Sequence, residues 1–308
     1  MALAVASLLW STTYVIAKPV LEVVPPLTLA LARFGLAAVI LIPIGLRQPG
    51  PLPSRRALLA LGFFGVTGFY VCLNVGLKLT SASAAALING AGPAVTALVA
   101  LPVVGERLRP IGVVGLIFSG LGVGLIVLSE AASGGGGAPL LGGLLVFGSS
   151  LSWAIYTALA RRLARYGALR LTAAAALVGT LLLVPLAAAE LLTVAVPPPS
   201  GPTIIAVLYM ALGPSAAAYL LWTAGLRVVP ANQAGAFLNL VPVGGVVLAA
   251  LVLGDLPPPG ALLGGGLVLA GVWLTTRLGH GGQPRRGAFG RASGHARPVA
   301  ARRYCDTK

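Results

Sequence analysis

Charged residues are scarce in this sequence, and long apolar runs take their place. Only 9% of the 308 residues are charged, 57% are hydrophobic, and the mean hydropathy is +0.97. An ordinary soluble domain carries about 25% charged residues. Too few charges remain here to cover a surface that faces water. The composition therefore excludes a soluble globular protein and indicates an integral membrane protein.

Cysteine and histidine are nearly absent as well. The two cysteines, Cys72 in an apolar run and Cys305 near the C-terminus, do not make a disulfide framework. Both histidines, His280 and His295, lie in the C-terminal tail. The sequence shows no metal-ligand cluster, no nucleophile–base pair and no phosphate-binding glycine loop followed by lysine. We therefore expect no metal, no cofactor and no enzymatic activity.

Acidic residues number only six against 21 Lys and Arg, which gives a net charge of +15. A charge of this size is typical of nucleic-acid-binding proteins. The basic residues, however, lie in short loops between apolar runs and in the tail, not along one helical face with interleaved aromatics. We therefore expect no nucleic-acid partner.

The apolar runs recur along the whole chain and predict ten transmembrane helices. About 20 helical residues span the hydrocarbon core of a bilayer, which is roughly 30 Å thick. The alternation typical of a barrel strand is absent. The first run could be a signal peptide, but no basic residue precedes Leu3 and the cleavage pattern is poor, so we interpret it as a span. The predicted spans are 2–22, 27–46, 57–77, 82–104, 111–129, 140–160, 171–192, 203–225, 231–253 and 260–276.

The distribution of Lys and Arg predicts the orientation of these spans. With a cytoplasmic N-terminus, 18 of the 21 Lys and Arg residues face the cytoplasm, Lys18 and Lys78 face outward, and Arg33 lies within a span. Cytoplasmic loops carry the excess of positive charge in membrane proteins. We expect a multi-pass protein of the inner (cytoplasmic) membrane with both termini in the cytoplasm. Residues 279–308, rich in Gly, Arg and Pro, are predicted to form a disordered basic cytoplasmic tail.

The chain contains an internal repeat with an offset of 149 residues. The two copies align without a gap. Chance matching of common residues explains the alignment poorly, because the two mid-span prolines and the two Gly–acid pairs also coincide. The offset aligns Tyr70 with Tyr219, Pro93 with Pro242, Gly105-Glu106 with Gly254-Asp255, Gly115 with Gly264, and Gly122 with Gly271.

Each half of the repeat holds five predicted spans, so the second half enters the membrane from the opposite side. Inverted repeats are typical of secondary transporters, whose substrate site lies near the midplane where the repeats meet. We therefore predict an all-α integral membrane fold, with ten transmembrane helices arranged as two inverted five-helix repeats around a central cavity. The repeats are expected at residues 1–137 and 138–278.

Several short motifs resemble those of the EamA-type transporters of the drug/metabolite transporter superfamily. The motifs are Leu9-Trp10-Ser11-Thr12-Thr13-Tyr14, Leu29-Ala30-Leu31-Ala32-Arg33-Phe34, Pro93 followed by Gly105-Glu106-Arg107-Leu108, Leu212-Gly213-Pro214-Ser215-Ala216, and Asn239-Leu240-Val241-Pro242. The resemblance covers residues 1 to about 278, and Asp255 stands where the second copy usually has Glu. It implies ten helices, a central cavity, and export or exchange of small metabolites such as amino acids.

Arg33 is the only charged residue well inside a predicted span. Placing such a charge in the membrane costs about 2.5–3.5 kcal/mol on insertion scales, and the side chain usually faces protein or water. One interpretation is a cation that binds a substrate carboxylate or phosphate. The alternative is a structural arginine that bonds to helix carbonyls or reaches outward to the interface.

Aromatic and polar residues in the spans complete the candidate cavity. Tyr156 and Trp222 lie near the inner edge, where Trp and Tyr gather at bilayer interfaces, and are interpreted as interfacial. The candidate substrate-binding residues are Trp10, Thr13, Tyr14, Arg33, Tyr70, Asn74, Asn89, Trp153, Tyr219 and Asn239. Pro93 and Pro242 each lack a backbone donor in mid-span, which predicts two kinks that could serve as hinges.

These features together predict a secondary transporter that exports or exchanges small metabolites, amino acids or related polar or amphipathic compounds, by alternating access. The alternatives are a carrier of sugar phosphates, nucleotide sugars or drugs in the same superfamily and, less favoured, a channel or a membrane subunit that transports nothing. The expected partners are a small-molecule substrate and the lipid bilayer, and a homodimer remains open.

Overall fold

The structure is a computed structural model that describes residues 1–48, 50–104, 108–133, 138–225 and 235–278. Within these residues, nine helices are long and apolar enough to cross a membrane. They are Ala2–Val23, Pro26–Gly45, Arg55–Leu79, Ala82–Val103, Pro110–Ala132, Pro139–Arg162, Ala168–Thr193, Gly201–Gly225 and Pro259–Thr276. These helices confirm nine of the ten predicted spans and establish a multi-pass membrane protein.

The remaining predicted span, 231–253, lies partly outside the described residues. Its described part contains the shorter apolar helix Phe237–Leu253. The predicted tail, 279–308, also lies outside the described residues, as does Glu106.

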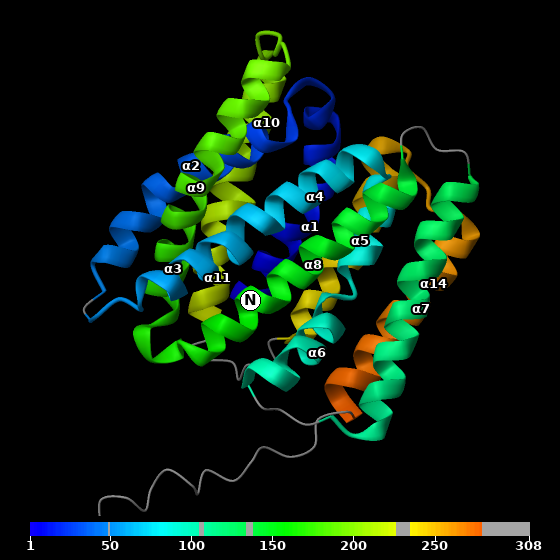
Figure 1. Cartoon of the computed structure of the whole chain (residues 1–308). Coiled ribbons are helices and arrows are strands. Elements are labelled where there is room, and N and C mark those ends of the chain that lie inside the picture. Colours follow the sequence, from blue (N-terminus) through cyan, green and yellow to red (C-terminus); the bar gives the residue numbers. More distant parts are fainter. Residues whose placement is uncertain (49, 105–107, 134–137, 226–234, 279–308) are drawn as a thin grey trace, which may run out of the picture.

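Figure 1 shows how the helical elements are arranged, and most spans are built from more than one of them. In the first part of the chain these are α1 (Ala2–Val23), α2 (Pro26–Leu46), α3 (Arg55–Gly62), η1 (Phe63–Thr67), α4 (Gly68–Leu79), α5 (Ala82–Asn89), α6 (Gly92–Val104) and α7 (Pro110–Ala132). They are followed by α8 (Pro139–Arg162), η2 (Ala164–Tyr166), α9 (Ala168–Thr193), α10 (Gly201–Met210), η3 (Ala211–Ala217) and α11 (Ala218–Gly225). The last elements are η4 (Gly235–Asn239), α13 (Leu240–Leu248), η5 (Ala249–Leu253), α14 (Pro259–Trp273) and η6 (Leu274–Leu278).

Local sequence signals explain where many of these helices begin. Proline occupies the first turn of α2, α7, α8, α10 and α14, where its missing N–H needs no partner. Serine caps α3, α5 and also α10: Ser54, Ser81 and Ser200 each accept a hydrogen bond from a backbone N–H three residues later. The helix boundaries are therefore encoded in the sequence next to each apolar run.

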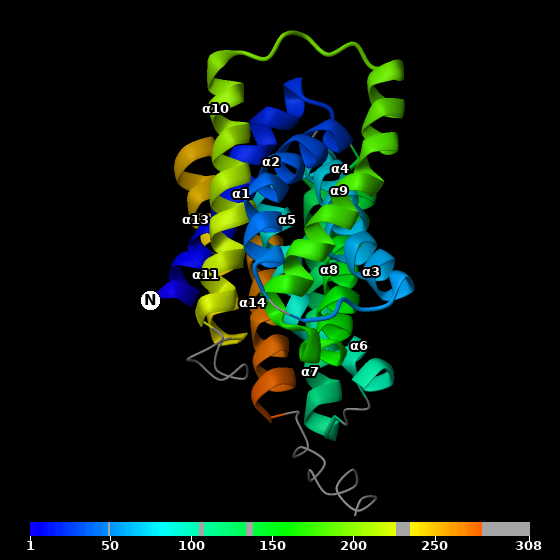
Figure 2. The same cartoon turned by 90° about the vertical axis from the view of Figure 1, so that its left-hand side faces the viewer.

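Long side chains on the outer faces of the helices are apolar. On α7, for example, Ile117, Leu121 and Leu128 are each more than half exposed. Outward-facing leucine and isoleucine suit contact with lipid tails rather than with water. Figure 2 shows that α9 and α10 flank α2 and that the connection 194–200 runs across the end of the bundle between them.

The fourth span is broken rather than kinked. Helix α5 ends at Asn89, residues Gly90 and Ala91 form a turn, and α6 starts at Gly92. Pro93 therefore lies in the first turn of a new helix, where its lack of a donor costs little. The distortion predicted at this proline is present as a two-residue turn within the span.

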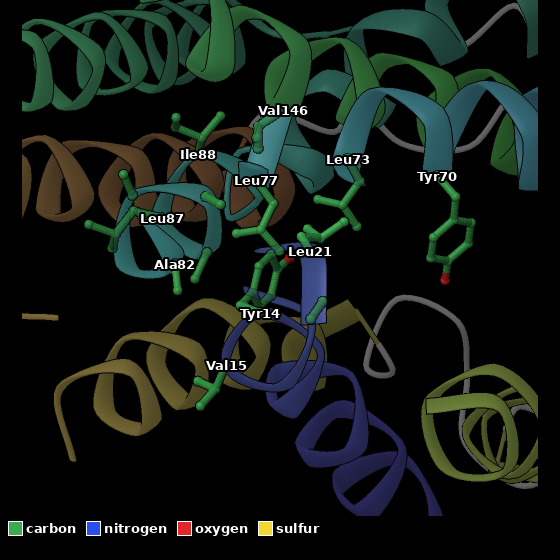
Figure 3. Packing of buried hydrophobic residues seen from close by; sticks show 14 of the residues in the cluster. Tyr14, Val15, Leu21, Tyr70, Leu73, Leu77, Ala82, Leu87, Ile88 and Val146 are labelled. Carbon is green, nitrogen blue, oxygen red and sulfur yellow. The ribbon is translucent and has the colours of Figure 1, made fainter. Parts of the chain in front are cut away.

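A matching change of helix type occurs before Pro242. The 3₁₀ segment η4 ends at Asn239, and α13 follows directly. Helices α5 and α13 meet closely: a Cβ added to Gly90 would lie 3.1 Å from Cβ of Pro242. Figure 3 shows Tyr14 of α1 among buried residues of α4 and α5, and a Cβ added to Gly245 of α13 would lie 3.2 Å from Cδ2 of Tyr14.

Helices α7 and α14 lie side by side along most of their length and touch through glycines (Figure 1). A Cβ added to Gly122 would lie 2.5 Å from the carbonyl oxygen of Gly264, and one added to Gly264 would lie 2.6 Å from the carbonyl oxygen of Gly122. Gly115 and Gly271 oppose each other in the same way. Small residues that let two backbones approach are a common basis of helix pairing in membranes.

Candidate functional site

Aromatic side chains from five helices meet in one continuous group, which we call the aromatic cluster. Trp10 of α1 lies near its middle, with ring centroids 6.3 Å from Trp153, 5.7 Å from Tyr219 and 5.3 Å from Trp222. Edge-to-face and tilted arrangements at these separations are favourable. The members are Trp10, Phe34, Phe69, Tyr70, Trp153, Tyr156, Tyr219 and Trp222.

Arg33 lies inside the protein beside this cluster and is completely buried. Its guanidinium carbon lies 4.6 Å from the ring centroid of Tyr70 and 5.8 Å from that of Phe34, within the range of cation–π attraction. Its Nε donates a hydrogen bond of 2.9 Å to Oγ of Ser215. The side chain therefore does not reach outward to the membrane interface.

The two terminal nitrogens of Arg33 are unpaired. Nη1 and Nη2 are buried and have no hydrogen-bond partner among the described residues. The helix carbonyls expected of a structural arginine are not bonded to them. Because an unpaired buried charge is costly, this edge of the guanidinium is the most distinctive chemical feature of the site.

A π-helical segment, η3, holds both Arg33 and Trp10. Ser215 in this segment accepts the Arg33 hydrogen bond, and the carbonyl oxygen of Pro214 accepts a 3.0 Å bond from Nε1 of Trp10. Proline and the wider π turn both disturb the usual backbone ladder, and such segments often occur at functional sites. The eighth span thus positions one polar and one aromatic residue of the site.

Five predicted residues meet in this region, and they are Trp10, Arg33, Tyr70, Trp153 and Tyr219. Tyr156 and Trp222, interpreted as interfacial from the sequence, also belong to the cluster. Sequence reasoning missed Phe34, Phe69 and Ser215. Phe34 directly follows Arg33, Phe69 directly precedes Tyr70, and Ser215 lies in one of the motifs of the second half. Position in the sequence alone does not show that these side chains point into the cluster.

Other predicted residues form a separate polar junction at the broken fourth span. Asn89 accepts a 2.7 Å hydrogen bond from Ser150 Oγ, its amide nitrogen lies 3.5 Å from Ser149 Oγ, and its side chain also interacts with Tyr14. These contacts tie the end of α5 to α8 and α1. Figure 3 shows the side chains of Tyr14 and Tyr70 in separate places along the packed core.

The remaining candidates lie in neither group. Asn74 is buried and donates a 3.0 Å hydrogen bond to the carbonyl oxygen of Pro26, and its Oδ1 is unpaired. Thr13 is buried in α1, three residues after Trp10, and Asn239 ends η4 and is half-buried. The structure therefore brings together about half of the predicted set.

The rings of the cluster leave little open space. The void lined by Phe34, Tyr156 and Tyr219 measures about 10 Å³, room for about one water molecule. A larger cavity of about 380 Å³ lies elsewhere, between Lys18, Glu22, Glu130 and Asp255.

Comparison with known proteins gives a consistent result over nearly the whole chain. A family described as the EamA-like transporter family matches residues 1–128 and 140–277. An uncharacterized transporter of Archaeoglobus fulgidus is 31% identical over 90% of this chain and 97% of its own length.

Two further relatives have more specific names. A probable terminal-alkyne amino-acid exporter of Streptantibioticus cattleyicolor is 31% identical, over 81% of this chain and 83% of its own. The aromatic amino acid exporter YddG of Ancylobacter novellus is 29% identical, over 89% of this chain and 95% of its own. A solved crystal structure with 25% identity superposes with a TM-score of 0.64 over 90% of this chain and 96% of its own.

Proposed function

This chain belongs to the EamA-like transporter family, and we propose that it exports or exchanges amino acids or related compounds across the cytoplasmic membrane by alternating access. Its relatives are named as transporters, and two of them as amino-acid exporters. The chain is thus a small-metabolite transporter, and the choice of amino acids within that class is the proposal.

The observation that carries the proposal is the buried cation beside aromatic rings. An amino acid offers a carboxylate, which suits the guanidinium of Arg33, and a side chain, which suits the rings of Tyr70 and Trp153. In this proposal the substrate site contains Trp10, Arg33, Tyr70, Trp153 and Tyr219, with Phe34 and Ser215 added from the structure.

The proposed architecture is two inverted five-helix repeats, residues 1–137 and 138–278, enclosing a cavity that opens during transport. The glycine contacts between α7 and α14 support it. The offset of 149 pairs Gly115 with Gly264 and Gly122 with Gly271, whereas the contacts are Gly122 with Gly264 and Gly115 with Gly271. Such crossed pairing is what a two-fold axis between equivalent elements requires.

Two further local features support the same repeat. The π segments η1 and η3 occupy matching places in the third and eighth spans once the offset is applied. The break before Pro93 and the change of helix type before Pro242 also match. Interrupted helices in corresponding positions of two halves are typical of transporter binding regions. We infer that Pro93 and Pro242 lie at the moving joints, with Tyr14, Thr13, Asn74, Asn89 and Asn239 lining or supporting the path.

Counterflow in proteoliposomes tests the proposed function. Vesicles preloaded with unlabelled phenylalanine or leucine are expected to accumulate the labelled amino acid transiently, with a rate that saturates with concentration. A channel would equilibrate the label with no overshoot, and a subunit that transports nothing would match protein-free liposomes. Glucose 6-phosphate, tested in the same way, separates an amino-acid carrier from a sugar-phosphate carrier.

The proposed topology places both termini in the cytoplasm. In a Cys72→Ser variant, Cys305 is the remaining cysteine of the chain. A membrane-impermeant maleimide is expected to label it in inside-out vesicles and not in intact spheroplasts, because the 18-to-2 excess of positive charge favours this orientation. Labelling in intact spheroplasts would contradict the orientation.

A further inference from the structure

The unpaired edge of Arg33 indicates which part of a substrate the site recognises. Arg33 is the one charged side chain that is fully buried among the described residues. Its Nη1 and Nη2 atoms have no hydrogen-bond partner there. A positive charge held this way in a membrane protein is uncompensated until an anion arrives.

Ser215 decides which edge of the guanidinium is free. Its Oγ accepts the hydrogen bond from Nε at 2.9 Å, and the guanidinium carbon lies 4.6 Å from the ring centroid of Tyr70. The edge of the guanidinium that carries Nη1 and Nη2 therefore stays free to bind a ligand. Two parallel N–H groups match the two oxygens of a carboxylate, which is the geometry of a bidentate pair.

Resting on the proposed transport of metabolites through this site, we infer that the site requires a free monocarboxylate on its substrate and does not require an ammonium group. Arg33 is then the residue that binds the carboxylate, and Ser215 is a positioning residue that acts through Arg33. Amino acids and their N-acylated derivatives fall within the accepted class, whereas amides and amines of the same side chains fall outside it.

Charge balance indicates that the substrate carries a single negative charge where it meets Arg33. One buried arginine neutralises one carboxylate, whereas a phosphate dianion would leave a net negative charge in a site lined by rings. Burying such a charge without a partner is costly. Sugar phosphates are therefore the poorer fit.

The described acids lie elsewhere, so none is placed beside Arg33 to bind a substrate ammonium. Glu190 accepts hydrogen bonds from the backbone N–H groups of Leu27 and Thr28 at the start of α2. Glu22, Glu130 and Asp255 line the separate 380 Å³ cavity. An ammonium group at the site would contact aromatic faces, which attract a cation. These faces carry no net charge, so a substrate without an ammonium group leaves no charge unpaired there.

Binding to the purified protein tests this inference without relying on transport. Trp10, Trp153 and Trp222 lie in the aromatic cluster, whereas Trp273 is 55% exposed on α14. A Trp273→Phe variant therefore reports on the site through tryptophan fluorescence. The probes are phenylalanine, N-acetylphenylalanine and phenylalaninamide, together with the same three forms of leucine.

We expect the acid and its N-acetyl derivative to bind with affinities within about fivefold of each other. The amide should bind about tenfold to a hundredfold more weakly, because it loses hydrogen bonds to a charged group. Arg33→Lys keeps the charge but not the paired donors, and should reduce the acid-to-amide ratio. Ser215→Ala should reduce the same ratio.

Matched variants control for general effects on the fold. Arg170→Lys alters an arginine that bonds the carbonyl oxygen of Gln48, and Ser119→Ala alters a buried serine on α7. Neither should change the acid-to-amide ratio. A merely structural role of Ser215 would alter melting temperature but not this ratio.

Three outcomes would overturn the inference: equal binding of acids and amides, an acid preference that survives both Arg33→Lys and Ser215→Ala, or no fluorescence response to any of the six compounds. None of these would by itself remove the proposed transport function. That function fails separately, if counterflow is absent in proteoliposomes.

Discussion

Replacing Arg33 with glutamine is expected to lower amino-acid counterflow by about a hundredfold or more. Glutamine keeps a polar side chain but removes the charge and the two unpaired terminal nitrogens, Nη1 and Nη2. Hydrogen bonds to a charged group contribute about 1.5–3 kcal/mol each, so the loss of a bidentate pair reaches this size.

The same substitution is expected to leave the melting temperature unchanged or to raise it. The wild-type protein buries a cation with two unpaired nitrogens, and removing an uncompensated charge relieves a cost. Function gained at the expense of stability is common at binding sites. A structural arginine would behave in the opposite way, with stability and transport lost together.

The measurement is the initial rate of counterflow in proteoliposomes, with melting of the detergent-purified protein followed in parallel. Arg170→Gln serves as the control, because this arginine bonds to Gln48 outside the aromatic cluster. A counterflow rate within about threefold of wild type in Arg33→Gln would remove Arg33 from the substrate site. A melting temperature lowered far more than in the control would assign it a structural role.

Replacing Gly264 with leucine is expected to prevent most of the protein from reaching its folded state. A Cβ at this position would lie 2.6 Å from the carbonyl oxygen of Gly122 and 2.8 Å from a side-chain carbon of Ile126. Neither backbone can yield without separating α7 from α14. Overpacking a close contact costs about 1–3 kcal/mol and occasionally more, and a branched side chain on a backbone contact belongs at the upper end.

Gly266 provides the matched control on the same helix. A Cβ there meets nothing within 4 Å, so Gly266→Leu should yield folded protein in wild-type amounts. The yield of folded Gly264→Ala protein is expected to lie between those of Gly264→Leu and Gly266→Leu. The measurement is the monodisperse fraction in size-exclusion chromatography and the melting temperature. Equal yields of Gly264→Leu and Gly266→Leu would show that the glycine contact does not set the spacing of α7 and α14.

Much of the architecture could be predicted because lipid imposes it locally. Apolar runs of membrane length, prolines such as Pro26 and Pro259 in the first turn, and capping serines such as Ser81 are all visible within one segment. Nine spans consequently agree with expectation to within a few residues. The ninth span was harder to delimit, since Gly235–Asn239 forms a 3₁₀ segment ahead of Pro242 rather than a uniform helix.

The candidate site could be predicted only in part. Trp10, Arg33, Tyr70, Trp153 and Tyr219 stand out as rare residue types inside apolar spans, and the fold gathers them. Asn89 is just as conspicuous in the sequence, yet it bonds to Ser150 and supports a broken helix instead. A polar residue in an apolar run must find a partner, but its segment alone does not say whether that partner is protein or substrate.

The sequence by itself determined that this chain crosses a membrane many times, where most helices begin and end, and which one charge lies within the membrane. These properties depend on hydropathy and backbone hydrogen bonding within a single segment. Only the tertiary structure decided that Arg33 meets Ser215, 182 residues away, and that Tyr156 and Trp222 face inward with Phe34 and Phe69. The direction in which a side chain points depends on how helices far apart in the chain rotate against one another, and apolar residues on every face of a membrane helix leave that rotation unspecified.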